Sequence, residues 1–338
     1  MSTATQLDTF VDLYTDLQNR VRGETGVAAR ENQAKRYINI ANHDINLAHG
    51  EKFWWAQREA VLITHPKYTT GTVSITKGNT NFSGVGGTAW NTANDIGQNN
   101  MRRYGKILVT GSNEVYEISG INADNAATLT AIFNNTTVTS VAYTYFEDEY
   151  ALASDFLKPV DLQQFADGIN LPIIGRTEMR ARWPRSRTLG RPNVAAITAR
   201  YNTGQEVEQR VLLHPAPDAA YRIPYRYVTR NLSLVVGSTQ AEDLVNDADK
   251  PTMPKQYRHA IVLHALYHWY RDQKDDSRWE AAKMEFEQVL QRMLEDVPIG
   301  SDRPRISPRI GQYRRNAKRP WGGSGRRYDT DGRFDRFE

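Results

Sequence analysis

Apolar residues recur with helical spacing towards both ends of this sequence. One amphipathic stripe is formed by Leu7, Phe10, Val11, Tyr14, Leu17 and Val21, and glycines at 23 and 26 follow it. A second stripe runs from Ala34 to Ala48 and stops at Gly50. Two more helices are predicted over 254–272 and from Trp279 to Pro298. Because all four must bury an apolar face, we expect the N-terminal and C-terminal pairs to form one bundle.

Residues 67–146 have a different composition, which is rich in Thr, Asn, Gly and Val and poor in charged residues. Period-two alternation over 72–76, turn residues at 77–79 and a second short run at 80–83 predict a hairpin. Further strands are expected near 106–109, 115–118, 128–133 and 142–146. Short strands at this spacing predict a small β-sandwich or barrel inserted between helical segments.

The segment after the insertion predicts a short helix near 161–165 and three strands at 193–200, 208–213 and 221–227. The fold class is therefore α+β, a helical bundle with an inserted β-domain and an extended C-terminal tail. The predicted divisions are a core of 1–65 and 150–298, which includes the strands near 193–227, an insert of 66–149, and a tail of 299–338.

Charge is distributed unevenly along the chain. The 338 residues hold 43 Lys and Arg against 39 Asp and Glu, a net charge of +4. The tail contains 11 basic and 5 acidic residues, so its charge is +6, while the other 298 residues total −2. The tail has five aromatic residues and, beyond Ile310, only one aliphatic residue, Ala317, so it cannot build a core of its own. We expect it to be disordered or to order only on a partner.

The absence of cysteine excludes disulfides, thiol nucleophiles and zinc fingers, and leaves His and carboxylates as metal ligands. No stretch resembles a transmembrane span or a secretory signal, so we expect no membrane association and a chain that stays where it is made.

Few residues suggest chemistry. His264 and His268 stand four apart on a predicted helix, a spacing that can present two imidazoles to a metal, but packing against aromatics is the favoured interpretation. The glycines of 84–87 lack the context of a phosphate loop, and the acidic runs 147–149 and 275–276 are expected to be solvated. We interpret 53–55, Phe-Trp-Trp, as a core anchor. No enzyme activity, cofactor or metal is predicted.

Two groups of arginines are the candidate binding residues. The first is Arg176, Arg180, Arg182, Arg185, Arg187 and Arg191. These could bind nucleic acid, or, as we favour, be solvated or pair with a neighbouring subunit. The second is the tail set Arg303, Arg305, Arg309, Tyr313, Arg314, Arg315, Arg319, Trp321, Arg326, Arg327 and Tyr328. Arginine and aromatics of this kind suit either single-stranded nucleic acid or a protein interface, and we favour the interface.

Several segments resemble a known family. The run 68–80, Tyr-Thr-Thr-Gly-Thr-Val-Ser-Ile-Thr-Lys-Gly-Asn-Thr, with Thr88-Ala-Trp90 and 107–118, is similar to the β-insertion of head-to-tail adaptor proteins of tailed bacteriophages. The helix pair ending at Phe53-Trp54-Trp55, the segment 150–156, Leu213-His-Pro-Ala-Pro-Asp218 and the closing helices of 254–296 also resemble that family. The resemblance covers most of residues 1–298; the tail is longer and richer in arginine than the minimal family pattern.

The resemblance implies a structural virion protein at the head–tail junction, assembled in the cytoplasm of the bacterial host. It implies a homo-oligomeric ring, commonly of twelve copies, that lies beneath the portal ring, continues the DNA channel and contacts a tail nozzle, stopper or tube protein. The C-terminal tail would dock on the portal, and tail fibres are a further expected partner. The alternatives are a tail terminator or stopper and a nucleic-acid-binding module that uses the Arg/aromatic tail. A carbohydrate hydrolase would need a carboxylate pair that cannot be assigned here.

Overall fold

The computed structural model describes residues 7–21, 28–162, 171–184, 187–201, 207–235, 237 and 239–296. The chain divides into two units at Leu294, and the elements below belong to the first unit except for the last two residues of α5. The tail 299–338 and the glycines at 23 and 26 lie outside the described residues.

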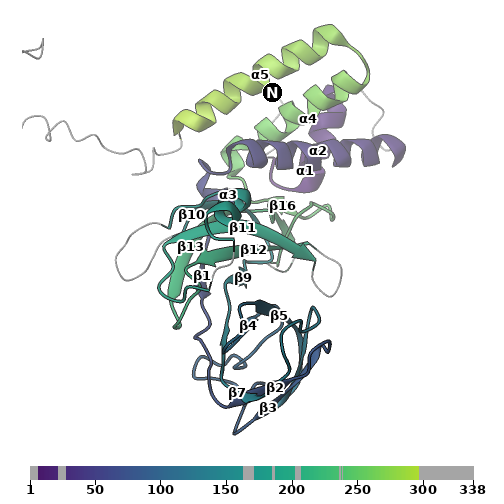
Figure 1. Ribbon diagram of the computed structural model, residues 1–338. Helices are drawn as coiled ribbons and strands as arrows, with labels where there is room; N and C mark the ends of the chain where they lie inside the picture. Colours follow the sequence, from purple (N-terminus) through teal and green to yellow (C-terminus); the bar gives the residue numbers. More distant parts are fainter. Residues whose placement is uncertain are drawn as a thin grey trace, which may run out of the picture. The chain divides into compact units, whose positions relative to one another are not determined.

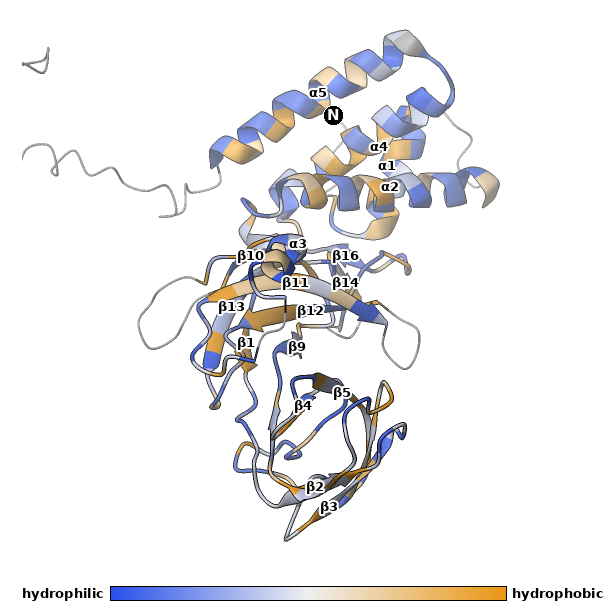
Figure 2. Ribbon diagram, in the orientation of Figure 1, coloured by the Kyte–Doolittle hydropathy of each residue, from blue (hydrophilic) through white to orange (hydrophobic). Residues whose placement is uncertain are grey.

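Four long helices match the amphipathic stripes (Figure 1). They are α1 (Phe10–Arg20), α2 (Ala28–His49), α4 (His259–Asp272) and α5 (Asp276–Asp296). Helix α1 begins where the backbone N–H of Thr9 donates to Asp12 Oδ2 at 2.9 Å, which satisfies a free donor at the helix start. Helix α2 ends before Gly50, where a Cβ would lie 2.4 Å from the carbonyl oxygen of Asn46. Figure 2 shows apolar and polar positions alternating along these helices, as amphipathic helices require.

The N-terminal helices pack against the C-terminal ones, as expected. Helices α1, α2 and α4 contact one another, and Leu13, Leu17 and Ile38 are fully buried among them. Helix α5 contacts α4 through aromatic rings, with Phe286 4.3 Å from His264 and Trp279 5.8 Å from Tyr267, measured between ring centroids. No helix in the described part of the chain has the length and apolar character needed to cross a membrane.

The aromatic run after α2 is a core anchor at two of its three positions. Phe53 and Trp55 are buried and stack at 4.5 Å, and the Trp55 indole donates to Asn46 Oδ1 at 3.1 Å. Trp54, in the 3-10 helix η1 (Trp54–Ala56), is 63% exposed. The prediction of a buried triple is therefore wrong for Trp54, because adjacent side chains leave the backbone in different directions.

The predicted insertion contains one seven-stranded antiparallel sheet. Its order is β7-β2-β3-β6-β5-β4-β8, and it curls into a half-barrel. The strands are β2 (Thr72–Ile75), β3 (Asn81–Val85), β4 (Lys106–Val109), β5 (Val115–Ala123), β6 (Ala126–Leu129), β7 (Val138–Val141) and β8 (Tyr143–Phe146). The predicted hairpin is present with Ile75 opposite Phe82, and Gly84 lies in β3.

The concave side of this sheet is filled by large aromatic residues. Trp90, Phe133 and Tyr145 are fully buried there with aliphatic residues of β2, β4, β5 and β6, while Val138 and Val141 of β7 pack against this core partly buried. The Trp90 indole donates to the Tyr143 hydroxyl at 2.8 Å, so the polar atoms of the ring cluster are paired. The curled sheet thus encloses its own core, and its two end strands, β7 and β8, are separated only by Ala142. The insertion is therefore barrel-like, as the sequence predicts.

The remaining strands form three small antiparallel sheets. Their orders are β1-β13-β10, β11-β12-β9 and β15-β14-β16. The strands are β1 (Gln57–Ile63), β9 (Glu149–Ala151), β10 (Phe156–Leu162), β11 (Val194–Tyr201), β12 (Val207–His214), β13 (Arg222–Thr229), β14 (Ser233–Val235), β15 (Thr239–Ala241) and β16 (Lys250–Pro251). The three strands predicted between 193 and 227 correspond to β11, β12 and β13.

Two sequence expectations fail in this region. The helix expected near 161–165 is instead the end of β10, where Asp161 pairs with Arg226 of β13, while 163–165 lie outside the described residues. Strand β1 was missed because its sequence, Gln-Arg-Glu-Ala-Val-Leu-Ile, alternates weakly and only Leu62 is buried. Strands β1 and β10 are extended because both pair with β13, and the local sequence pattern contains no signal of that pairing.

Candidate functional site

Five of the six arginines predicted between 176 and 191 lie in the described part of the chain, and Arg185 lies outside it. Helix α3 (Arg176–Arg182) carries Arg176, Arg180 and Arg182, all exposed; Arg191 is also exposed and Arg187 is half-buried. Arg182 pairs with Glu178 on the same helix at 2.6 Å. The predicted group is therefore an exposed basic segment, of which one member is already neutralised by a local acid.

Helix α3 is held on the β11-β12-β9 sheet by apolar contacts. Met179 is buried, and the Trp183 ring stacks on the His214 ring at 4.2 Å between centroids. Arg176 and Arg180 stand one turn apart and line a pocket of about 170 Å³. Lys106 and Arg200 line the same pocket, as do Asp148 and Glu149.

The acidic run 147–149 corrects the expectation of a solvated charge cluster. All three side chains are buried, with Glu147 at 5%, Asp148 at 2% and Glu149 at 7% exposure. Glu147 accepts from Arg102 and from the hydroxyl of Tyr145, and Asp148 pairs with Lys106. The run connects β8 to β9, so each carboxylate is enclosed where the chain passes from the seven-stranded sheet to the β11-β12-β9 sheet. Burial is tolerated because cations from elsewhere in the chain meet these acids.

Glu149 lies at the centre of the pairing. Its carboxylate accepts from the Thr198 hydroxyl at 2.8 Å and from Arg200 Nε at 2.8 Å. Arg200 also makes a two-pronged contact with Glu117 of β5, at 2.8 Å for each nitrogen–oxygen pair. A single guanidinium therefore joins a strand of the inserted sheet to β9 and β11.

Burial and pairing shift the pKa values of these acids in opposite directions. Burial raises the pKa of Asp148, and Lys106 only partly offsets it. Burial also acts to raise the pKa of Glu149, but hydrogen bonds from Arg200 and Thr198 outweigh it and hold that pKa below its usual value. Asp148 Oδ1 is buried and has no hydrogen-bond partner among the described residues.

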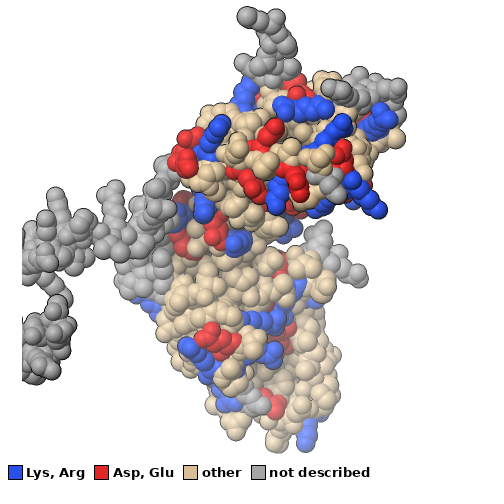
Figure 3. Space-filling model, turned by 90° about the horizontal axis from the view of Figure 1, so that it is seen from above, with Lys and Arg blue, Asp and Glu red and all other residues tan. Residues whose placement is uncertain are grey.

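Charge on the surface is mixed in sign. On the face shown in Figure 3, Lys and Arg side chains alternate with Asp and Glu and form no continuous basic area. This agrees with the near-neutral count of the chain outside the tail. The tail arginines and aromatics, Arg303 to Tyr328, lie outside the described residues.

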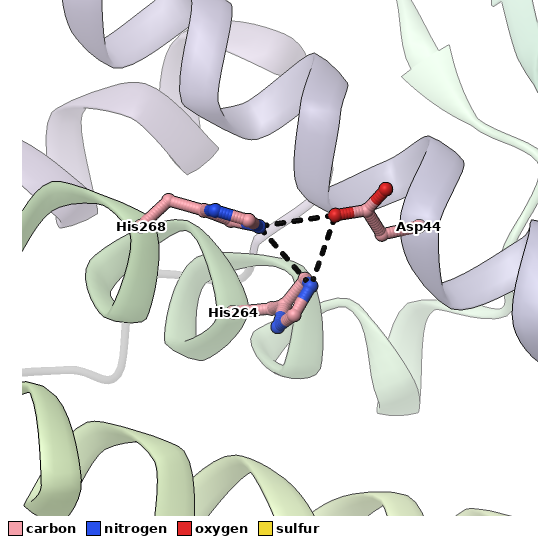
Figure 4. A group of neighbouring side chains, drawn as sticks. All are labelled: Asp44, His264 and His268. Atoms are coloured by element: carbon pink, nitrogen blue, oxygen red, sulfur yellow. Dashed lines mark hydrogen bonds and ion pairs between the residues drawn. The ribbon is translucent and has the colours of Figure 1, made fainter. Parts of the chain in front are cut away.

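A second cluster combines the predicted histidine pair with a distant acid (Figure 4). His264 Nε2 and His268 Nε2 lie 3.3 Å apart on α4. Asp44 Oδ2, from α2, is 3.4 Å from the first nitrogen and 3.1 Å from the second. Burial, with His268 as a close neighbour, lowers the pKa of His264 to about 4, and burial also lowers the pKa of His268. Both rings are therefore neutral near pH 7.

Sequence reasoning found the two histidines but not Asp44, which is 224 positions from His268. It also missed Arg102, Lys106 and Arg200 as partners of the acidic run. Nothing local marks these residues, because each is an ordinary charged side chain whose partner comes from another element.

The family comparison gives a match over much of the chain. The family model described as SU10 adaptor protein matches residues 119–316. The match begins within β5 of the inserted sheet, includes α3, α4 and α5, and runs past α5 into the basic tail. No curated protein matches the sequence.

Proposed function

Because this chain belongs to the SU10 adaptor protein family, and is thus a phage adaptor and a component of the virion, we propose that it forms a ring that joins the portal to the tail. In this role the ring continues the DNA channel below the portal, and twelve copies is the expected number. The observation that carries the proposal is the family match over more than half of the chain, 119–316.

The portal contact is assigned to the tail. The family match ends at 316, so the first part of the tail, with Arg303, Arg305, Arg309, Tyr313, Arg314 and Arg315, belongs to the segment shared with the family. Arg319, Trp321, Arg326, Arg327 and Tyr328 lie beyond it. A segment that orders on its partner can cover a large surface, and Arg, Tyr and Trp are frequent at the centres of such interfaces. We assign portal docking to 299–316 and an added contact to 317–338.

Contacts between subunits are assigned to two exposed apolar patches. The first consists of Val61 and Ile63, which stand two apart on one side of β1, and of Trp54 just before that strand; they are 49%, 39% and 63% exposed. The second lies where β11 ends beside the first residue of β12, with Tyr201 (72% exposed) opposite Val207 (50% exposed). Two different patches on one subunit fit a head-to-tail contact, which closes into a ring when the rotation is right.

The basic segment on α3 has two roles that this proposal allows. Arg176 and Arg180 contact either an acidic surface of the neighbouring subunit or the DNA that passes through the channel. DNA binding would weaken steeply with salt, because each neutralised phosphate releases counterions. A nucleic-acid-binding module remains the alternative function, favoured by this exposed pair and by the +6 charge of the tail.

Light scattering coupled to size-exclusion chromatography tests the proposal. The full chain, a chain ending at 298 and a chain ending at 316 are each measured alone and mixed with the portal protein of the same phage. The full chain should join the portal in a fixed stoichiometry, the 316 form should retain most of this binding, and the 298 form should lose it. Failure of all three to bind the portal, with retention of the full chain on DNA at low salt, would favour the nucleic-acid module instead.

A further inference from the structure

We propose that Asp44, His264 and His268 form a binding site for a divalent ion of the zinc class, which fastens α2 to α4. The donor set is two imidazole nitrogens and one carboxylate oxygen. Zinc prefers such N and O ligands, and an arrangement of three protein ligands leaves a fourth position for water. The proposal is independent of the adaptor function, since it concerns the helices and not the ring.

The distances among the three donor atoms fit one metal ion. In a tetrahedral site with metal–ligand bonds of about 2.0–2.1 Å, the ligands lie about 3.3–3.4 Å apart. The nitrogen–nitrogen distance here is 3.3 Å, and the two nitrogen–oxygen distances are 3.1 and 3.4 Å. Three donors on two helices thus form a triangle of nearly the right size.

The orientation of the rings supports the same assignment. Both histidines turn the same nitrogen, Nε2, towards Asp44 Oδ2 (Figure 4). An imidazole nitrogen that carries no proton can direct its lone pair at a cation, and both Nε2 atoms point to the same place between the two rings and Asp44. His264 and His268 are one turn apart on α4, which places their rings on one face.

Burial and access also suit a metal. The side chains of His264 and His268 are 14% and 9% exposed, so a bound ion would be shielded from competing water on that side. The Asp44 side chain is 45% exposed, which provides an entry path and room for a fourth ligand. Phe286 and Tyr267 pack on the His264 ring, and the Tyr37 ring lies parallel to that of His268, so both imidazoles are held in place.

The second ring nitrogen of His264 determines how tightly the site should bind an ion. His264 Nδ1 is buried and has no hydrogen-bond partner among the described residues. Metal-binding histidines usually donate this second N–H to an acceptor, and loss of such a partner weakens binding about 10–100-fold. We therefore expect micromolar affinity for Zn²⁺ and a modest stabilising effect of the ion on the folded chain.

Calorimetric titration of the full untagged chain with Zn²⁺, after chelator treatment, tests the site. One equivalent should bind to the wild type. Asp44→Asn and His264→Gln should each abolish that binding, while His43→Gln should retain it. His43 is the matched control, because it precedes Asp44 in α2 and pairs instead with Asp243 at 3.0 Å. No binding to the wild type, or equal binding to wild type and both site variants, overturns the proposal.

Co²⁺ provides a readout that does not depend on the variants. Co²⁺ added to the wild-type chain should give the intense visible absorption of a four- or five-coordinate ion, and one equivalent of Zn²⁺ should displace it. Weak bands typical of six-coordinate Co²⁺ would show that the three donors do not act together. Circular dichroism of Asp44→Asn and His264→Gln identifies any variant that fails to fold, in which case the Co²⁺ spectrum decides the question.

Discussion

Arg200 of β11 donates to both carboxylate oxygens of Glu117 on β5, at 2.8 Å each. Its remaining nitrogen, Nε, donates to the buried Glu149 at 2.8 Å. The guanidinium also lies over the Tyr104 ring, 5.0 Å from its centroid. One planar cation with five donors thus satisfies two acids from different sheets, which the single ammonium of lysine cannot reproduce.

Arg200→Lys should destabilise the chain by about 1–3 kcal/mol, measured as the free energy of unfolding in urea. Lysine keeps the charge but loses the two-pronged contact and leaves part of the buried Glu149 unpaired. The exposures of Arg200 and Glu117, 27% and 25%, keep the effect below that of a fully buried pair.

Arg278→Lys is the control for this change. Arg278 pairs with Asp275 at 3.4 Å and its side chain is 65% exposed, so its replacement should cost no more than about 0.5 kcal/mol. Equal losses for the two variants would show that the Arg200 contacts do not stabilise the junction.

The neighbouring acids Asp148 and Glu149 should respond oppositely to pH. The lowered pKa of Glu149 stabilises the folded chain above the unfolded pKa, and this contribution is lost as pH falls through the folded pKa. The raised pKa of Asp148 has the opposite effect on stability. Its contribution to folding is present below the unfolded-state pKa and is lost as pH rises through the folded-state pKa. Relative to wild type, Glu149→Gln should therefore be more destabilising near neutral pH than in acid. Asp148→Asn should be less destabilising near neutral pH than in acid.

Chemical denaturation of the wild type and both variants at about pH 4 and about pH 7 measures these differences. Each variant serves as the control for the other, since both remove one buried carboxylate from the same run. Shifts of the same sign in both variants would contradict the opposite assignments.

The helices could be predicted from sequence because their apolar stripes report burial directly. Phe10, Tyr14 and Leu17, or Ala34 and Ile38, are inside as the 3.6-residue period requires. Most strands of the inserted sheet could be predicted for the same reason, since Thr72–Ile75 and Lys106–Val109 alternate cleanly between half-buried and buried positions. Strand β7 (Val138–Val141) was not predicted, because none of its residues is buried and its sequence carries no alternating pattern.

The charged contacts could not be predicted in this way. Glu147, Asp148 and Glu149 have the composition of a solvated run, and their burial depends on cations such as Lys106 and Arg200, which stand in other strands. Asp44 likewise meets His264 only because α2 and α4 pack together. Pairs separated by 42 positions, as for Lys106 and Asp148, or by 224, as for Asp44 and His268, leave no periodic signal in a single sequence.

Gly105 should be intolerant of any side chain. A Cβ at this position would lie 2.2 Å from the Tyr145 ring, which is fully buried in the core of the seven-stranded sheet. Gly105→Ala should lower the free energy of unfolding by about 3 kcal/mol, because the ring cannot move without disrupting its neighbours. Gly120→Ala, in β5 of the same sheet, has no atom within 4 Å of its Cβ and should change stability by less than about 1 kcal/mol. A similar cost at both positions would contradict this packing.

The proposed contact between subunits predicts a particular behaviour of mixtures. Trp54→Ser and Tyr201→Ser each remove the most exposed apolar residue of one patch, 63% and 72% exposed, and should leave folding stability within about 0.5 kcal/mol. Each variant alone should be monomeric by light scattering, because a head-to-tail ring needs both patches on every subunit. Mixed in equal amounts, the two variants should form dimers and nothing larger, since only one intact pair of patches remains. Val245→Ser, at a residue 68% exposed outside both patches, should still form rings. Rings formed by either single variant would show that these patches do not join the subunits.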